Sequence, residues 1–198
     1  KYRRLKGEDA TRYSSNEEGE YDWNGSYKTY HYFKYEPIKW RVLNRNGNDA
    51  FLLADVALDD QKYNTNYEDV TWETSSMRSW LNGYGASVNQ PKTDYSRKNF
   101  IDSAFTSTQK NAIKTTNVVN NNNIDYGTAG GNNTSDKVFL LSESEVYNTD
   151  MAEGYGFVKD SETDDEARRS RCSTYAYAMG TYRSYDTEYT KYNGNIWW

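Results

Sequence analysis

Two segments in the first third of the chain alternate in polarity with a period of two residues, and both predict β-strands. Residues 30–37 alternate in this way. In the segment that follows, Ile38, Trp40 and Val42 share one face, with lysine and arginine side chains on the other. Trp40 is therefore expected to be buried, and its replacement by alanine is expected to cost about 3–5 kcal/mol.

A β-hairpin is predicted directly after this second strand. Asn46-Gly47 is the strongest short-range signal for such a turn. Residues 50–56 form the returning strand, and because nearly all of them are apolar we expect that strand to be central in its sheet. Residues 137–141 are also mostly apolar, which predicts another buried strand.

Short helices are predicted where apolar residues recur at helical spacing. Residues 75–82 have this spacing, with serine and threonine at the start and glycines at the end. Thr106 and Gln109 fit a capping box, in which each side chain satisfies a backbone donor of the other residue. A second helix is therefore expected over about 108–114.

Two further helices are predicted in the last third of the chain. Residues 142–145 open one of them by the same capping logic. Residues 166–179 have helical spacing, and Gly180 follows as a natural C-terminal cap.

The polar segments set the expected domain organisation. Residues 1–25 are charged and dotted with glycine, which predicts a linker or weakly ordered arm. Residues 59–69 form a polar loop, and residues 118–135 are an excursion rich in asparagine and glycine that is too polar to pack. The remaining chain, residues 26–198, is expected to form one domain.

Aromatic residues explain how so polar a chain can fold. Its mean hydropathy is -1.10, and aliphatic residues are too scarce for an ordinary core. The chain has 20 tyrosines, 6 tryptophans and 6 phenylalanines, against 1 histidine and 1 cysteine. Each large ring buries roughly 150–250 Å² while its polar tip finds a hydrogen-bond partner. We therefore expect a thin aromatic core with long polar loops.

Charge and hydropathy limit the classes of partner. The net charge is -5, whereas proteins that bind duplex nucleic acid have a basic face, so we expect no nucleic-acid partner. No apolar run approaches the roughly 18–20 residues of a membrane-spanning helix, so we expect no membrane insertion. Cys172 cannot form an internal disulfide and is expected to be a small packed residue.

The titratable residues give little support to catalysis or to a metal. His31 lies in an aromatic segment without a second histidine, which disfavours zinc. Acidic residues cluster at Asp55, Asp59 and Asp60 and again over 160–166, and we interpret both clusters as solvated loops. Calcium at these oxygens and a glycosidase pair of carboxylates are the alternatives. No cofactor is expected.

A structural ion pair is predicted around the helix at 75–82. Glu73 lies just before this helix and Arg78 lies inside it, with Arg41 available from the neighbouring strand. We expect the pair to dock the helix on the sheet. The residues with predicted structural roles are Trp40, Arg41, Trp72, Glu73, Arg78 and Trp80.

A ligand-binding surface is predicted in the C-terminal tail. Tyrosine mixed with serine and asparagine is typical of adaptable binding surfaces, because a rigid amphipathic ring supplies contact area at low entropy cost. Aromatic faces also stack on sugar rings. The predicted ligand-binding residues are Tyr182, Tyr185, Tyr189, Tyr192, Trp197 and Trp198.

Several segments together resemble a bacterial family, the domain of unknown function 6273, from about Tyr27 to Trp198. The segments that carry the resemblance are 35–43, 71–82, 104–106, 136–142, 174–176 and 197–198. The family is similar in turn to the C-type-lectin-like group, which includes the formylglycine-generating enzymes. Family members usually continue beyond the double tryptophan, so the last strands of the fold are expected to be missing here.

The resemblance implies an α+β fold of the C-type-lectin-like kind, with short helices around small twisted antiparallel sheets. It also implies a module of surface or secreted proteins of Gram-positive bacteria, so we expect an extracellular or cell-surface location. The expected function is non-catalytic binding of a glycan or a protein. The alternatives are an enzyme related to the formylglycine-generating oxidases, which use paired cysteines and copper where this chain has only Cys172, and a structural spacer. The oligomeric state stays open.

Overall fold

The computed structural model divides the chain into two compact units. Unit 1 comprises residues 1–60 and 148–198, and unit 2 comprises residues 61–147. The residues that the structure describes are 1–11, 21–123, 126–147, 155, 157, 170–181 and 195–196.

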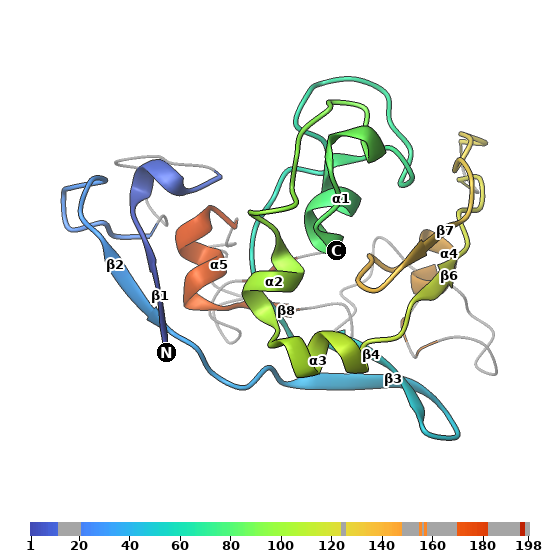
Figure 1. Cartoon of the computed structure of the whole chain (residues 1–198), viewed down its shortest axis with the longest axis horizontal. Helices are drawn as coiled ribbons and strands as arrows, with labels where there is room; N and C mark the ends of the chain where they lie inside the picture. The colour runs from blue at the N-terminus through green and yellow to red at the C-terminus, as the bar shows by residue number, and fades with distance from the viewer. Residues whose placement is uncertain are drawn as a thin grey trace. The chain divides into compact units, whose positions relative to one another are not determined.

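Unit 1 begins with an antiparallel pair of strands whose inner face packs on a helix. Strand β1 (Tyr2–Leu5) pairs with β2 (His31–Lys34), and helix α5 (Thr174–Met179) lies beside them (Figure 1). Leu5, Phe33, Trp23 and Ala178 form the buried cluster between the strands and the helix, with partly buried tyrosines around it. Rings bearing a polar tip therefore supply much of this core, as the composition predicts.

This pairing differs from the expectation of a linker or arm at the residues of 1–25 that the structure describes, 1–11 and 21–25. Tyr2–Leu5 is a strand, Gly7–Asp9 is a turn of 3-10 helix, and both Leu5 and Trp23 are buried. A four-residue strand with a single apolar position has too little pattern to be recognised in sequence, because its burial depends on distant partners.

The predicted hairpin is present, but it is less buried than expected. Strands β3 (Trp40–Asn46) and β4 (Asp49–Ala54) pair antiparallel around Asn46-Gly47, with a register shift between Val42 and Asn44. These two strands form a sheet of their own. The prediction that residues 50–56 are central is therefore wrong, and Trp40 is 36% exposed and not part of the core.

A third sheet in unit 1 joins segments that are distant in sequence. Strand β5 (Val56–Ala57) pairs parallel with β8 (Ser170–Cys172), and β8 pairs antiparallel with β9 (Asn195–Ile196). Within 170–179, the described part of the helix predicted over 166–179, the chain forms a strand followed by α5, so the prediction is wrong at 170–172, and α5 ends at Gly180 as expected. Gly180 has φ 117°, a left-handed conformation that favours glycine.

Unit 2 contains short helices with side-chain caps. In α1 (Ser76–Asn82), Ser75 caps the start, and Gly83 ends the helix with φ 73°. A side chain on Gly83 would approach the amide of Asn99 to 2.9 Å. Asn99 in turn caps α2 (Phe100–Ala104), a helix that the sequence patterns did not indicate.

The other two helices of unit 2 confirm the capping predictions. The Thr106–Gln109 box opens α3 (Ser107–Ala112). Ser142 and Glu145 exchange the same kind of hydrogen bonds at the start of α4 (Glu143–Tyr147).

The asparagine-rich excursion is bounded by two paired strands. Strand β6 (Thr116–Val118) pairs antiparallel with β7 (Thr134–Asp136), and Val118 is buried. The prediction that residues 118–135 are too polar to pack is therefore wrong at both ends. The buried strand predicted at 137–141 is also wrong, because the strand ends at Asp136 and Leu140 is exposed.

The described residues thus form a mixed fold of small, mostly antiparallel sheets with short helices, which confirms the α+β class at this coarse level. The β5–β8 pair is parallel and departs from the expected pattern. Among these residues, no helix has the length and apolar character needed to cross a membrane.

Candidate functional site: a buried aspartate network and an exposed tyrosine face

Unit 2 is organised around a fully buried carboxylate, that of Asp136. The Arg78 Nε donates to both of its oxygens, at 2.9 and 3.0 Å. The Trp72 Nε1 donates to Oδ2 at 3.1 Å, and the Tyr84 hydroxyl donates to Oδ1 at 2.9 Å. The Thr134 hydroxyl donates to Oδ2 at 2.6 Å. We call these five residues the Asp136 network.

The ion pair that the sequence predicts for Arg78 has a different partner. Arg78 contacts Glu73 only through the Glu73 backbone carbonyl, at 2.9 Å, and forms its salt bridge with Asp136. The Glu73 carboxylate accepts a hydrogen bond from the Asn132 amide instead, at 2.9 Å. Arg78 and Asp136 are 58 positions apart, and pattern reasoning within one segment could not connect them.

The environment of Asp136 holds it in the charged form. Burial alone would raise its pKa, but the hydrogen bonds from Arg78 and Thr134 and the charge of Arg78 outweigh this and lower the pKa. The same carboxylate contributes to raising the pKa of Tyr84 to about 12, after the larger effect of burial. A charged, fully hydrogen-bonded carboxylate in the interior is a structural element, because no lone pair is left to act on a substrate.

The remaining residues with predicted structural roles lie in both units. In unit 2, Trp72 is buried in the network and Trp80 stacks on Phe100 with ring centroids 5.5 Å apart. In unit 1, Arg41 forms a salt bridge with Asp55 at 2.8 Å, and this pairing lowers the pKa of Asp55. Arg41 therefore stabilises the β3–β4 hairpin through Asp55 and is separate from the Arg78–Asp136 pair of unit 2.

A second buried aspartate, Asp59, lies in unit 1 and has weaker compensation. Its side chain is 5% exposed, and the nearest guanidinium nitrogen of Arg3 is 3.6 Å away. Burial raises its pKa to about 6, against the opposing effects of the Asp60 backbone N–H and Arg3. Arg3 also lies over the ring of Tyr175, 4.4 Å from the ring centroid. The Tyr175 hydroxyl is buried without a hydrogen-bond partner among the described residues.

The candidate metal ligands are dispersed. His31 is on β2, where its Nδ1 is 2.9 Å from the Tyr21 hydroxyl, and Cys172 is on β8. Within the described part of the chain, no three histidine, cysteine, aspartate or glutamate side chains are grouped so that they could hold a metal ion. The acidic cluster at 160–166 lies outside the described residues.

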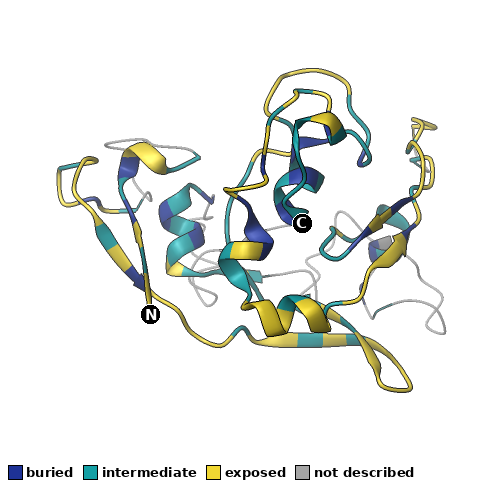
Figure 2. Ribbon diagram, in the orientation of Figure 1, coloured by how far each residue is buried: buried dark blue, intermediate teal, exposed yellow. Residues whose placement is uncertain are grey.

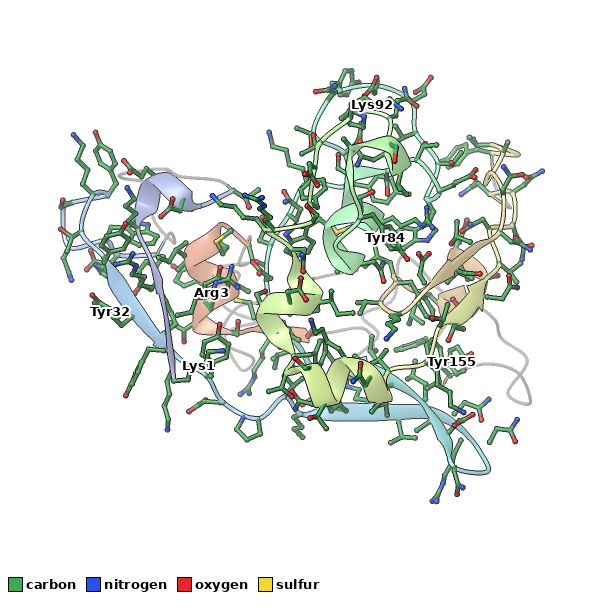
Figure 3. All side chains as sticks on the ribbon, in the orientation of Figure 1. Lys1, Arg3, Tyr32, Tyr84, Lys92 and Tyr155 are labelled. Carbon is green, nitrogen blue, oxygen red and sulfur yellow. The ribbon has the colours of Figure 1, made fainter. Side chains whose placement is uncertain are left out.

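Among the described residues of unit 1, the most exposed aromatic side chains are on the outer face of β1 and β2. Tyr2 and Tyr32 are 65% and 66% exposed, and Figure 2 marks exposed positions of both strands in yellow. Figure 3 shows Tyr32 on the side of β2 away from α5, whereas Arg3 lies toward the helix. Because side chains alternate along a strand, the inner residues pack and the outer ones stay in water.

Rings and cations alternate on this outer face. Tyr2 is opposite Lys34, and Arg4 is opposite Tyr32. Just beyond the paired residues, Tyr30 has the Arg4 guanidinium 4.6 Å and the Lys6 ammonium 5.6 Å from its ring centroid. We define the tyrosine–cation face by these residues: Tyr2, Arg4, Lys6, Tyr30, Tyr32 and Lys34.

This face was not predicted as a binding surface. The period-two alternation of residues 30–37 places Tyr30, Tyr32 and Lys34 on one side, so the signal is present in the sequence. The partner strand β1 lies in the segment for which the sequence predicts a polar arm. The tail residues predicted to bind ligand, Tyr182, Tyr185, Tyr189, Tyr192, Trp197 and Trp198, lie outside the described residues.

Comparison with models of known protein families identifies the family of the chain. A family model described as a domain of unknown function, DUF6273, matches residues 47–198. The chain belongs to the DUF6273 family. The DUF6273 match contains the whole Asp136 network, whereas both strands of the tyrosine–cation face lie before it. No curated protein and no solved structure matches the chain.

Proposed function

We propose that this chain is a non-catalytic binding module of a bacterial surface protein, and that it holds an extracellular glycan or protein through exposed tyrosines. The observation that carries the proposal is the tyrosine–cation face. In a protein whose core depends on aromatic rings, Tyr2 and Tyr32 of one small sheet, and Tyr30 beside it, are nevertheless exposed to solvent. The proposal includes a C-type-lectin-like arrangement of the fold.

Tyrosine on a rigid strand suits binding for a physical reason. Its ring has few rotatable bonds, so ordering it against a ligand costs little entropy, and its hydroxyl adds a hydrogen bond. On the inner face of β1–β2, Leu5 and Phe33 are buried and fix the strand positions. The outer rings are thereby positioned before a ligand arrives, which reduces the cost of binding.

The test is to immobilise the full chain and screen it against a glycan array and against extracellular protein extracts. We expect a retained ligand, and we expect the double variant Tyr2→Ala with Tyr32→Ala to lose most of it. The matched control is Tyr67→Ala with Tyr126→Ala, which removes two rings of unit 2 that are 110% and 86% exposed. Equal losses in both double variants would show that exposed rings contribute non-specifically.

The tail tyrosines remain a second candidate surface, and one variant separates the two. Tyr185→Ala is expected to leave the melting temperature nearly unchanged. If it abolishes retention while the Tyr2 and Tyr32 variant binds normally, the ligand binds at the tail and not at β1–β2. Silence across both screens, with a folded near-UV circular dichroism spectrum, would argue for a structural spacer.

A further inference from the structure

We propose that the tyrosine–cation face binds an anionic polysaccharide, an inference that rests on the proposed binding function and names its ligand class. Each ring on this face is opposite or beside a cation. A sugar acid presents the complementary pair of surfaces: a ring with C–H faces and a negatively charged group. The combination fits a chain of such units better than a neutral sugar.

The cations on this face retain charge that a ligand can use. Arg4 has no carboxylate within ion-pair distance among the described residues, and it rests over the Tyr30 ring. Lys34 is 3.7 Å from Glu36, but both side chains are largely exposed, so this pair is weak. Lys6 pairs with Glu8. An incoming carboxylate or sulfate therefore meets an unpaired guanidinium and a weakly paired ammonium.

The geometry of the sheet gives the face a regular spacing. On one strand, residues two positions apart lie about 6–7 Å from each other, and opposite residues on paired strands have Cβ atoms about 4.5–5.5 Å apart. Arg4 is thus flanked by Tyr2 along its strand and by Tyr32 across the sheet. Guanidinium groups bind carboxylates and sulfates with charge-assisted, often bidentate hydrogen bonds.

Two other classes of polyanion or partner fit less well. Duplex nucleic acid is bound by neutralising a row of phosphates, whereas this face has only the cations Arg4, Lys6 and Lys34, of which Lys6 pairs with Glu8. The centres of protein interfaces are depleted of lysine and contain apolar anchors. Here lysine and arginine lie among the rings, and no exposed aliphatic side chain belongs to the face.

The experiment is affinity electrophoresis of the full chain in gels that contain polygalacturonate, dextran sulfate, methyl-esterified polygalacturonate, neutral dextran or single-stranded poly(dT). We expect retardation by polygalacturonate or dextran sulfate, and the two arms distinguish carboxylate from sulfate recognition. The esterified polymer keeps the same sugar rings without the charge, and we expect it to bind at least about tenfold more weakly.

Variants then assign the binding to this face. Arg4→Gln is expected to weaken binding roughly five- to tenfold and Tyr32→Ala by a similar factor. The matched controls are Lys62→Gln and Tyr67→Ala, which remove an exposed cation and an exposed ring from unit 2 and should change the affinity less than about twofold. Near-UV circular dichroism checks that every variant is folded.

Each other outcome overturns the inference. Equal binding of esterified and free polygalacturonate would show that charge is not recognised, while the proposed function as a binding module would still stand. Tighter binding of poly(dT) would indicate nucleic acid, and no retardation by any anionic polymer would exclude this ligand class. The glycan and protein screens test the proposed function independently, since neutral glycans and proteins are among their probes.

Discussion

Each compact unit contains an aspartate whose side chain is buried. The two differ in how many hydrogen bonds from the protein replace those that the carboxylate makes with water. Asp136 in unit 2 accepts hydrogen bonds from Arg78, Trp72, Tyr84 and Thr134. Asp59 in unit 1 has a backbone N–H and an arginine at 3.6 Å. The pKa of Asp136 is lowered, whereas the pKa of Asp59 is raised to about 6.

The difference teaches that burial alone does not decide what a carboxylate does for stability. Moving a charge out of water is costly, and only a complete set of donors offsets the loss of hydration. Asp136 has that set, so its charged form belongs to the native state of unit 2. Asp59 lacks a complete set of donors, so its charged form at neutral pH destabilises unit 1.

The sharpest test of this comparison is Asp136→Asn, for which we expect a loss of about 3–5 kcal/mol in the free energy of unfolding. The amide leaves Arg78 buried without its counter-charge. Because the pKa of Asp136 is lowered in the folded state, its contribution is present above the unfolded pKa, about 3.9, and is lost as the pH falls through the folded pKa. Urea denaturation at pH 7 and pH 3 measures both effects.

The control for this variant is Asp69→Asn, an exposed aspartate of the same unit. We expect it to change the free energy of unfolding by less than about 0.5 kcal/mol. If Asp136→Asn behaved like this control, the hydrogen bonds around Asp136 would be unimportant and the contrast with Asp59 would disappear.

The opposite sign is expected for Asp59→Asn, which should stabilise the protein by about 1–3 kcal/mol at pH 7.5. A raised pKa means that the folded state holds its proton more tightly than the unfolded state. The stabilising effect of Asp59 is complete below the unfolded pKa and is lost as the pH rises through about 6. The asparagine stays neutral at every pH. The extra stability of the variant over wild type should therefore appear between pH 4 and 6 and persist above that range.

Urea midpoints of wild type and variant across pH 4–8 measure this divergence. A stabilisation of the same size at pH 4 and at pH 7.5 would show that the substitution acts through packing and not through the charge of Asp59. The Asp69→Asn protein again serves as the control, with no divergence expected.

For Trp72→Phe we expect about 1–3 kcal/mol of destabilisation, less than for Asp136→Asn. The change removes the indole N–H that donates to Asp136 and to Thr134 while keeping an aromatic ring in the core. Because the two residues share one network, the loss in the double variant with Asp136→Asn should be smaller than the sum of the single losses. Thermal and urea unfolding give the four free energies needed.

Trp80→Phe is the matched control, since that indole packs on Phe100 in the same unit. Its effect should be smaller and additive with Asp136→Asn. Strict additivity for Trp72→Phe as well would mean that the donors around Asp136 act independently and do not form a network.

Local signals in the sequence found the helices better than the sheets. Capping residues such as Thr106, Gln109 and Gly180 act within a few positions, so the local sequence predicts where α3 begins and where α5 ends. The local sequence of a strand does not identify the strand with which it pairs. The sequence therefore predicts an arm at Tyr2–Leu5, which forms a strand, and a buried Trp40, which its two-stranded sheet leaves partly exposed.

The candidate sites follow the same division. The position of Arg78 inside a helix predicts a structural ion pair, yet its partner Asp136 is 58 positions away. The exposed tyrosine face of β1 and β2 likewise depends on a strand pairing that no local pattern shows. The asparagine content of 118–135 predicts poor packing, whereas Asn132 donates a hydrogen bond to Glu73 and Asn123 donates one to Glu143. Side-chain amides can thus fix a polar loop to its surroundings, and composition does not reveal when they do.

The order of units along the chain has a consequence for biosynthesis. Unit 2 is inserted between the two parts of unit 1, and the hydrogen bond from Ser170 to the Asp55 carbonyl joins positions 115 residues apart. As domains generally fold in the order in which the ribosome releases them, residues 61–147 emerge complete while unit 1 still lacks β8 and α5. Strands β1 and β2 therefore lack the packing of α5 until late in synthesis, so a nascent chain with only about its first 150 residues outside the ribosome would carry a finished insert within an unfinished host.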